Sequence, residues 1–166
     1  MFKKLFGKKE EVNKENVLVS PLDGKVVPLE EVPDPVFSQK MMGEGIAVEP
    51  TNGEVVSPVD GKIVQVFPTK HAVGIETDSG LEILVHIGLE TVSMNGEGFE
   101  GHVSQGDKVS AGDKLITFDV DLVKEKAKST VTPVIITNSD SVESMDTLNS
   151  GDVVKGQTEL LKVTAK

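Results

Sequence analysis

The chain consists of short runs of β-branched and aliphatic residues that turn-forming residues interrupt about every 8–12 positions. Val, Ile and Leu fill the runs, and Asp-Gly, Asn-Gly and proline-containing segments separate them. β-Branched residues suit the pleated surface of a sheet, whereas glycine and proline end regular elements. The runs expected as strands include GIAVEP, HAVGIET, LEILVHIG, KLITFDV, TPVIIT and ELLKVTA. The sequence therefore predicts an all-β fold, an antiparallel β-sandwich of the jelly-roll or barrel-sandwich type with one or two short helices.

The core of such a sandwich must be aliphatic, because the 166 residues include six Phe but no Tyr or Trp. This length suits one domain with a substantial core. A formal net charge of −10 opposes binding to nucleic acid. The lack of cysteine excludes disulfides, thiolate nucleophiles and Cys-ligated metals. No apolar run approaches the ~20 residues of a membrane span and no signal peptide is evident, so we expect a cytoplasmic protein.

One nine-residue segment occurs twice. VSPLDGKVV at residues 19–27 returns as VSPVDGKIV at residues 56–64, a displacement of 56 − 19 = 37 positions. A proline, an Asp-Gly turn and an apolar run in each copy are typical of a bend that leads into a strand. Two copies are too few for a solenoid. We expect them at related places in the two halves of one sandwich.

Two segments depart from the strand pattern. DVDLVKEKAKS carries good helix formers, and Asp121 is the predicted N-cap of that helix. Residues 1–16 are expected to form a flexible N-terminal tail before a domain of residues 17–166. Because apolar residues lie at helical spacing among the lysines of MFKKLFGKK, weak contact of the tail with a membrane surface is the alternative.

His86 interrupts the apolar run LEILVHIG, and a buried imidazole needs partners for its two nitrogens. If Ser79 and Gly80 form a two-residue loop, Val73 lies opposite His86, and His71 lies diagonal to His86 on the same face of the hairpin. A four-residue loop keeps this register. A three-residue loop would place the two rings on opposite faces.

Two imidazoles, with the Thr69 hydroxyl two positions before His71, admit three kinds of site. A zinc site needs three or four ligands, and no such set is visible at a standard spacing. A Ser-His-Asp hydrolase lacks its G-x-S-x-G elbow. The third kind is a nucleophilic histidine that accepts a phosphoryl group on one nitrogen while the other is anchored, with a second imidazole donating to the developing charge. The alternative for His86 is a hydrogen-bonded core histidine.

Residues 80–92, GLEILVHIGLETV, resemble the signature of the glucose-type enzyme IIA domain of the bacterial sugar phosphotransferase system. That signature is Gly, two free positions, three aliphatics, the active His, an aliphatic, Gly, an aliphatic, a free position, Thr and a small aliphatic. The likeness runs from about Val17 nearly to the C-terminus. Other segments that are similar to the family are Val32-Pro33-Asp34 before Phe37, Gly43 to Ala47, Lys70-His71-Ala72, Gly96 to Phe99, Phe118-Asp119, Lys126 to Ser129, Thr132 to Val134, and Asn138.

The resemblance implies an antiparallel sandwich with a shallow active-site depression. It implies that His86 accepts a phosphoryl group from the phosphocarrier protein HPr and passes it to a cysteine of the IIB domain of a sugar permease. His71 would steady the phosphoryl oxygens, and Thr69 would be bonded to His71. The resemblance implies no cofactor and no resident metal, and membrane contact only through the permease or, weakly, through the tail.

The resemblance also implies a docking surface for these partners. Its expected apolar rim consists of Val36, Phe37, Phe67 and Leu84. Ordinary core packing is the alternative for each of them, and is nearly as strong for Leu84. Asp34 and Glu90 match family positions where acidic groups meet a basic partner, with a solvated surface role as the alternative. His102 matches no functional position and is expected in a surface loop.

Two residues depart from the family pattern, and one segment is similar to a different class of protein. Val73 and Ile87 stand where regulatory family members often carry phenylalanine, which puts in doubt a regulatory role and partner-induced zinc binding between the histidines. Regulatory target proteins stay a further class of partner. GHVSQGDKVSAGDKL resembles biotinyl and lipoyl carrier domains, but Ser79 stands at the hairpin tip where those carriers need lysine. A regulatory β-domain without phosphotransfer is the other alternative.

Overall fold

A computed structural model describes residues 14–166, so most of the tail expected over residues 1–16 lies outside the described residues. The first strand already begins at Glu15. The strands are β1 (Glu15–Val19), β2 (Gly24–Pro28), β3 (Glu44–Pro50), β4 (Glu54–Val56), β5 (Gly61–Val66), β6 (Ala72–Glu76), β7 (Glu82–His86), β8 (Phe99–Gly101), β9 (Lys108–Val109), β10 (Lys114–Phe118), β11 (Thr132–Ile136), β12 (Val142–Thr147), β13 (Asp152–Val153) and β14 (Glu159–Ala165).

Helical segments are few and short. The two α-helices are α1 (Pro35–Ser38) and α2 (Val120–Lys126), and the 3-10 turns are η2 (Leu29–Glu31), η3 (Thr91–Met94) and η4 (Ser139–Ser141). The predicted all-β antiparallel sandwich with one or two short helices is therefore confirmed. No helix within residues 14–166 combines the length and the apolar character that crossing a membrane requires.

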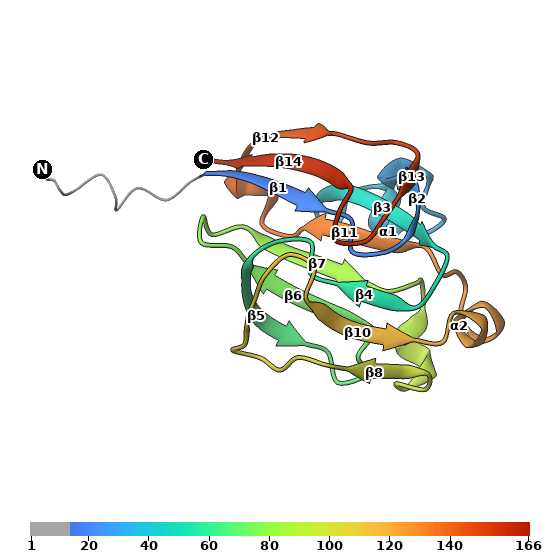
Figure 1. The fold of residues 1–166 in the computed structure, drawn as a ribbon. Coiled ribbons are helices and arrows are strands. Elements are labelled where there is room, and N and C mark those ends of the chain that lie inside the picture. Colours follow the sequence, from blue (N-terminus) through green and yellow to red (C-terminus); the bar gives the residue numbers. More distant parts are fainter. Residues whose placement is uncertain (1–13) are drawn as a thin grey trace, which may run out of the picture.

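The strands form one eight-stranded sheet, β13-β2-β3-β11-β7-β6-β5-β9, and two three-stranded sheets, β1-β14-β12 and β4-β10-β8. In Figure 1 the two small sheets lie at opposite ends of the molecule, and the C-terminus lies beside the start of β1. A pseudo-twofold axis between β7 and β11 relates the two halves of the eight-stranded sheet, β11-β3-β2-β13 and β7-β6-β5-β9, and relates the two small sheets to each other. One half is the continuous segment β4 to β10, and the other combines β1 to β3 with β11 to β14.

The repeated nine-residue segment supplies the bend before each half's hairpin. In the first copy the Ser20 hydroxyl donates to the Leu22 carbonyl at 2.6 Å, and in the second the Ser57 hydroxyl donates to the Val59 carbonyl at 2.7 Å. The two bends also bond to each other, through Val19 N–H to Pro58 O and Val56 N–H to Pro21 O, both at 2.9 Å. The expectation that the copies occupy related places in two halves is confirmed.

Strand pairing extends this equivalence through the eight-stranded sheet. The cross-strand pair Val26–Val48 in one half corresponds to Ile63–Ile75 in the other. In the same way, Val48–Thr132 corresponds to Ile75–Ile83. Counting three residues on from Thr132 and Ile83, Ile135 is the counterpart of His86. Counting four residues back from Val48 and Ile75, Glu44 is the counterpart of His71.

The halves differ most in one connection. The β2–β3 connection spans residues 29–43, whereas the β5–β6 connection spans residues 67–71, a difference of 15 − 5 = 10 residues. The longer connection contains η2 and α1, which cover one face of the large sheet. The cluster buried there is separate from the main core and consists of Leu29, Val32, Phe37, Ala47, Ala72, Leu84, Leu89, Val131 and Ile135.

The structure decides one local question that the sequence left open, the length of the hairpin loop, and corrects one prediction, the N-cap of α2. Asp78-Ser79-Gly80 form a three-residue loop, closed by Thr77 N–H to Leu81 O at 2.9 Å, so Ala72 lies opposite His86 in place of Val73. Gly80 has φ +89°, as a turn followed by a left-handed residue requires. The N-cap of α2 is Asp119, not Asp121, because Asp119 keeps the extended backbone of the preceding strand and accepts from Leu122 N–H at 3.1 Å.

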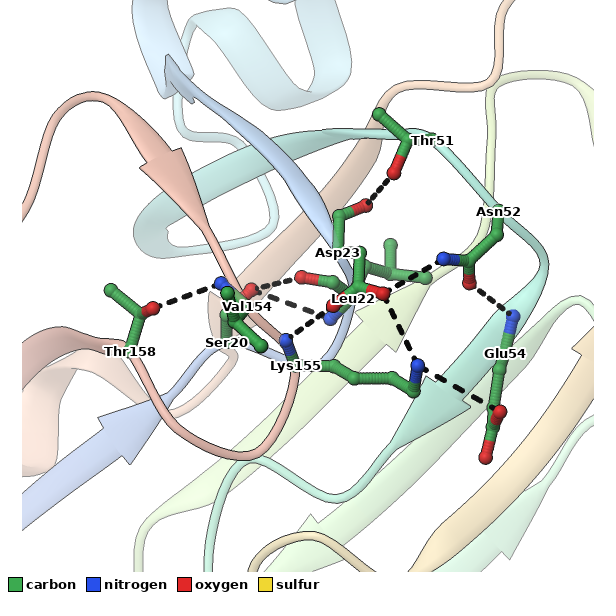
Figure 2. A network of polar contacts seen from close by, with 9 residues as sticks. All are labelled: Ser20, Leu22, Asp23, Thr51, Asn52, Glu54, Val154, Lys155 and Thr158. Atoms are coloured by element: carbon green, nitrogen blue, oxygen red, sulfur yellow. Dashed lines mark hydrogen bonds and ion pairs between the residues drawn. The ribbon is translucent and has the colours of Figure 1, made fainter.

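Asp23, in the Asp-Gly turn of the first copy, joins three distant segments (Figure 2). Its carboxylate accepts from the Lys155 backbone N–H and the Asn52 side chain, both at 2.8 Å, and from Lys155 Nζ at 3.2 Å. Lys155 Nζ also lies 3.8 Å from a Glu54 carboxylate oxygen. The backbone hydrogen bond from Lys155, then that from Asn52, holds the pKa of Asp23 below its ordinary value of 3.8.

We predict that Asp23→Ala lowers the free energy of unfolding by about 1–2 kcal/mol, because charged-acceptor hydrogen bonds are lost at a partly exposed site. Because folding lowers the pKa of Asp23, its carboxylate stabilises the folded state above pH 3.8. This stabilisation is lost as the pH falls through the folded-state pKa. The deficit of the variant should therefore shrink in acid. Urea unfolding as a function of pH measures it.

The matched control is Asp60→Ala in the second copy, where the carboxylate accepts one bond, from Ala111 N–H at 2.8 Å. Its loss should be smaller than that of Asp23→Ala. Equal losses in the two variants would contradict the assigned role of the Lys155 and Asn52 contacts.

Candidate active site

The rings of His71 and His86 meet at the adjoining ends of β6 and β7. Their centroids lie 5.0 Å apart, with the ring planes at 80°. His86 is the last residue of β7, and its backbone neighbour Ile87 donates its N–H to the His71 carbonyl at 2.7 Å. The sequence prediction that the two rings lie together is thus correct.

The rings meet although the hairpin has the three-residue loop. The three-residue loop was expected to separate the rings, because side chains alternate between the faces of a strand. His71, however, precedes β6 and follows a turn in which Lys70 N–H donates to Phe67 O at 2.8 Å. Lys70 has φ +61°, so alternation does not extend to His71, and its ring contacts that of His86.

One nitrogen of each ring has an intramolecular partner. His86 Nδ1 lies 2.9 Å from the Gly88 carbonyl oxygen, and His71 Nδ1 lies 2.5 Å from Thr69 Oγ1. A carbonyl only accepts, so His86 Nδ1 carries the proton and, in the neutral ring, Nε2 keeps the lone pair. A hydroxyl both donates and accepts, so the Thr69 contact allows either tautomer of His71.

Both rings favour the neutral form. Desolvation, with a further contribution from the His86 ring, lowers the pKa of His71 from 6.5 to about 4. Desolvation also lowers the pKa of His86, while the Gly88 hydrogen bond and the Asp34 carboxylate partly offset it. His71 is 4 % exposed, whereas His86 is half-buried. At neutral pH, His86 therefore presents an uncharged nitrogen with a lone pair.

Aromatic rings flank the histidines. The Phe37 ring centroid lies 5.1 Å from that of His86, and the Phe67 ring meets His71 edge-on at 5.3 Å. Phe37 reaches this place because Asp34 caps α1, accepting Val36 N–H at 3.0 Å, and Pro35 begins the helix. These rings restrict the approach of water to the imidazoles.

The residues expected to bind partners divide by exposure. Val36 and Glu90 are exposed, and Asp34 and Phe67 are intermediate. Phe37 and Leu84 are 3 % and 6 % exposed, so they pack beneath the site and offer almost no area to a partner. The expected rim therefore loses two members as surface residues, because their strand and helix faces point into the cluster under η2 and α1.

Several residues had no part in the site predicted from the sequence. Met41, Met42 and Val92 are exposed apolar residues, two of them next to α1 and the third in η3. Gly88 and Thr91 were quoted within the signature, but no role was given to the Gly88 carbonyl or the Thr91 hydroxyl. His102 lies in an exposed loop as expected, with Nε2 3.0 Å from Thr117 Oγ1.

Two other features bear on what the site can hold. Within residues 14–166, no group of three His, Cys, Asp or Glu residues could bind a metal ion. A cavity of about 580 Å³ lies between β12 and the β2–β3 region, lined by Val26, Lys40, Glu44 and Met145 among others, and neither histidine lines it. This cavity is therefore separate from the place where the two rings meet.

The chain is similar to known proteins over most of its length. The sequence model of the family described as phosphoenolpyruvate-dependent sugar phosphotransferase system, EIIA 1, matches residues 16–142. A "PTS system glucose-specific EIIA component" of Bacillus anthracis is 60 % identical over 166 residues, covering 100 % of both chains. A protein of the same description from Staphylococcus aureus (strain N315) is 53 % identical over 164 residues, covering 99 % of both.

A solved structure shares the fold. The glucose permease IIA from Mycoplasma capricolum matches with a TM-score of 0.85 and 44 % identity, covering 90 % of this chain and 96 % of that one. These likenesses confirm the resemblance read from GLEILVHIGLETV and favour it over the biotinyl, lipoyl and purely regulatory alternatives. The chain belongs to the EIIA 1 family of the phosphoenolpyruvate-dependent sugar phosphotransferase system and is a phosphoryl carrier of that system.

Proposed function

We propose that His86 Nε2 accepts the phosphoryl group from the phosphohistidine of HPr and delivers it to a cysteine of the IIB domain of a permease. Because relatives are described as glucose-specific, a glucose permease is the proposed destination. The observation that carries the assignment is the 2.9 Å contact between His86 Nδ1 and Gly88 O. That contact leaves the lone pair on Nε2 of a half-buried, neutral ring.

Each transfer exchanges one bond for another. In the first, the His86 Nε2 lone pair forms a P–N bond while the P–N bond of HPr breaks and its electron pair returns to the HPr ring. In the second, a thiolate of IIB forms a P–S bond while the His86 P–N bond breaks and its electron pair returns to Nε2. Such exchanges need positioning more than driving force.

His71 is proposed to stabilise the phosphoryl oxygens. If the Thr69 hydroxyl donates to His71 Nδ1, the proton of the neutral His71 ring resides on Nε2, where it can be donated to a phosphoryl oxygen. The two rings would then hold opposite tautomers. A carbonyl partner makes His86 a nucleophile, and a hydroxyl partner makes His71 a donor.

The proposed docking surface surrounds the two rings. Its apolar members are Val36, Phe67, Met41, Met42 and Val92, and its acidic members are Asp34 and Glu90. Phe37 and Leu84 support it from below by packing. We place the start of the phosphoryl-carrying domain at Glu15, two residues before the expected boundary of 17–166, because β1 begins there. We propose that this domain acts in the cytoplasm with HPr and IIB. The acidic members predict basic residues on both partners.

We predict that enzyme I, HPr and phosphoenolpyruvate transfer an acid-labile, base-stable phosphoryl group to the wild-type chain and not to His86→Ala. Loss of Nε2 removes the only atom proposed to form the P–N bond. The matched control is His102→Ala, which removes an exposed histidine outside the site and should be labelled normally. Labelling of His86→Ala would reject the assignment, and an unlabelled wild-type chain would reject the proposed function.

A second prediction concerns His71→Gln. His86 should still accept phosphate in this variant, whereas onward transfer to IIB should slow by roughly 10²-fold, since one donor to the developing charge is misplaced. Single-turnover transfer from the labelled variant to purified IIB measures this. Wild-type rates in that assay would show that His71 has no such role.

A third prediction concerns pH. Because folding lowers the pKa of His71 to about 4, the unfolded chain binds more protons below pH 6.5. The neutral His71 ring therefore costs the folded state no stability above pH 6.5. As the pH falls toward about 4, the free energy of unfolding decreases by at most ~1.4 kcal/mol per pH unit, because the unfolded chain takes up the proton first. Urea unfolding of wild type and His71→Gln across that range should show the difference as a flatter pH profile in the variant. Parallel profiles would contradict it.

A further inference from the structure

The segment after His86 holds two successive peptide groups in fixed orientations. In the first, the Ile87 carbonyl accepts the Thr91 hydroxyl at 2.6 Å. In the second, the Leu89 N–H donates to the Ser129 carbonyl at 2.9 Å. The Leu89 carbonyl, which belongs to the peptide group after these two, accepts Lys128 N–H at 3.2 Å. Ile87, Leu89 and Thr91 are each at most 1 % exposed, so water does not compete for these bonds.

The Gly88 carbonyl belongs to the second of these peptide groups. A peptide group is planar and trans, so its carbonyl points opposite to the Leu89 N–H of the same plane. Fixing Leu89 N–H on Ser129 thus directs the Gly88 carbonyl, which reaches His86 Nδ1 at 2.9 Å. The orientation of the acceptor depends on backbone geometry at residues 87–89.

Glycine at position 88 permits the left-handed backbone conformation, but it also leaves that backbone free to rotate. Gly88 has φ +74°, and a Cβ there would lie 2.7 Å from Thr91 Cγ2 and 2.8 Å from Ser129 O. No larger residue fits, yet glycine itself has the greatest backbone freedom. Ser129 holds the peptide that follows Gly88, and the Thr91 side chain holds the peptide that precedes it. Without the Thr91 bond, Gly88 could rotate about its φ.

We propose that Thr91 is a positioning residue for phosphoryl transfer, whose hydroxyl fixes the Ile87 carbonyl and so keeps the Gly88 carbonyl on His86 Nδ1. The inference rests on the proposed role of His86. Its consequence is that the Nδ1–H tautomer is retained and the lone pair stays on Nε2. Ile87 also donates its N–H to the His71 carbonyl, so the residue whose carbonyl Thr91 holds is bonded to His71 as well.

The test compares Thr91→Val, which removes the hydroxyl at nearly constant shape, with Thr91→Ser, which retains it. The matched control is Thr77→Val at the other end of β7. Thr77 is also buried, at 6 % exposure, and its hydroxyl accepts Leu81 N–H at 3.1 Å. Ring ¹⁵N shifts report the His86 tautomer in the unphosphorylated proteins, and single-turnover transfer from phospho-HPr reports acceptance.

We expect a single Nδ1–H tautomer of His86 in wild type, Thr91→Ser and Thr77→Val. In Thr91→Val we expect a mixture that includes the Nε2–H form, and acceptance slower by about tenfold to a hundredfold, the scale of a misplaced reacting group. If Thr91→Val does not fold, Thr91→Ala, which leaves space without crowding, replaces it in the same comparison.

An unchanged tautomer in the hydroxyl-free variant, with no more loss of acceptance than in Thr77→Val, would overturn the proposal and leave Thr91 a purely structural residue. The tautomer is read without HPr. If wild type is never phosphorylated, the proposed function fails, while the ¹⁵N comparison still decides whether Thr91 fixes the His86 ring.

Discussion

The hydrogen bond from His86 Nδ1 to the Gly88 carbonyl is the interaction on which the proposed phosphoryl transfer depends. An isolated imidazole exchanges its proton between two nitrogens, and only one tautomer leaves Nε2 able to attack phosphorus. An acceptor without a proton of its own decides between them. Desolvation complements this choice by lowering the pKa of His86, so the ring is neutral as well as correctly protonated. Orientation, tautomer and charge thus have two local causes, one carbonyl and one apolar environment.

The apolar environment comes from an asymmetry in an otherwise symmetric sandwich. The β2–β3 connection is ten residues longer than its counterpart, and its helix α1 places Phe37 against His86. A capping carboxylate, that of Asp34, starts this one-turn helix and lies close enough to affect the pKa of His86. Asp34, which is expected to meet partners, therefore also caps α1, and an N-cap side chain commonly stabilises a helix in this way.

Much of the fold could be read from the sequence because turn residues and β-branched runs act locally. The Asp-Gly repeat predicted equivalent bends, and the aliphatic run around His86 predicted a buried strand. The length of the hairpin loop stayed open between two, three and four residues, because Thr-Asp-Ser-Gly-Leu also fits a three-residue loop with left-handed Gly80. The N-cap of α2 was misplaced for a similar reason, since two aspartates two positions apart compete and only the backbone of the preceding strand selects Asp119.

The site was harder to read than the strands. The signature named His86, but the burial of Phe37 and Leu84 depends on which face η2 and α1 cover, and that is a long-range contact. The two histidines lie close together because the backbone turns at Lys70, and the alternation of side chains along a strand does not predict such a turn. Contacts made by main-chain carbonyls, such as that of Gly88, leave no mark in side-chain patterns, so only coordinates identify them.

The pseudo-twofold axis has a consequence for stoichiometry. The two halves provide two equivalent positions, but Ile135 occupies the counterpart of His86, and Glu44 occupies that of His71. Ile135 is fully enclosed beneath the long connection. The β2–β3 connection, which places Phe37 against His86, therefore also buries Ile135 at the position equivalent to His86. With His86 as the one proposed acceptor, the molecule would carry a single phosphoryl group at a time, and its donor and recipient would have to bind at the same place in turn.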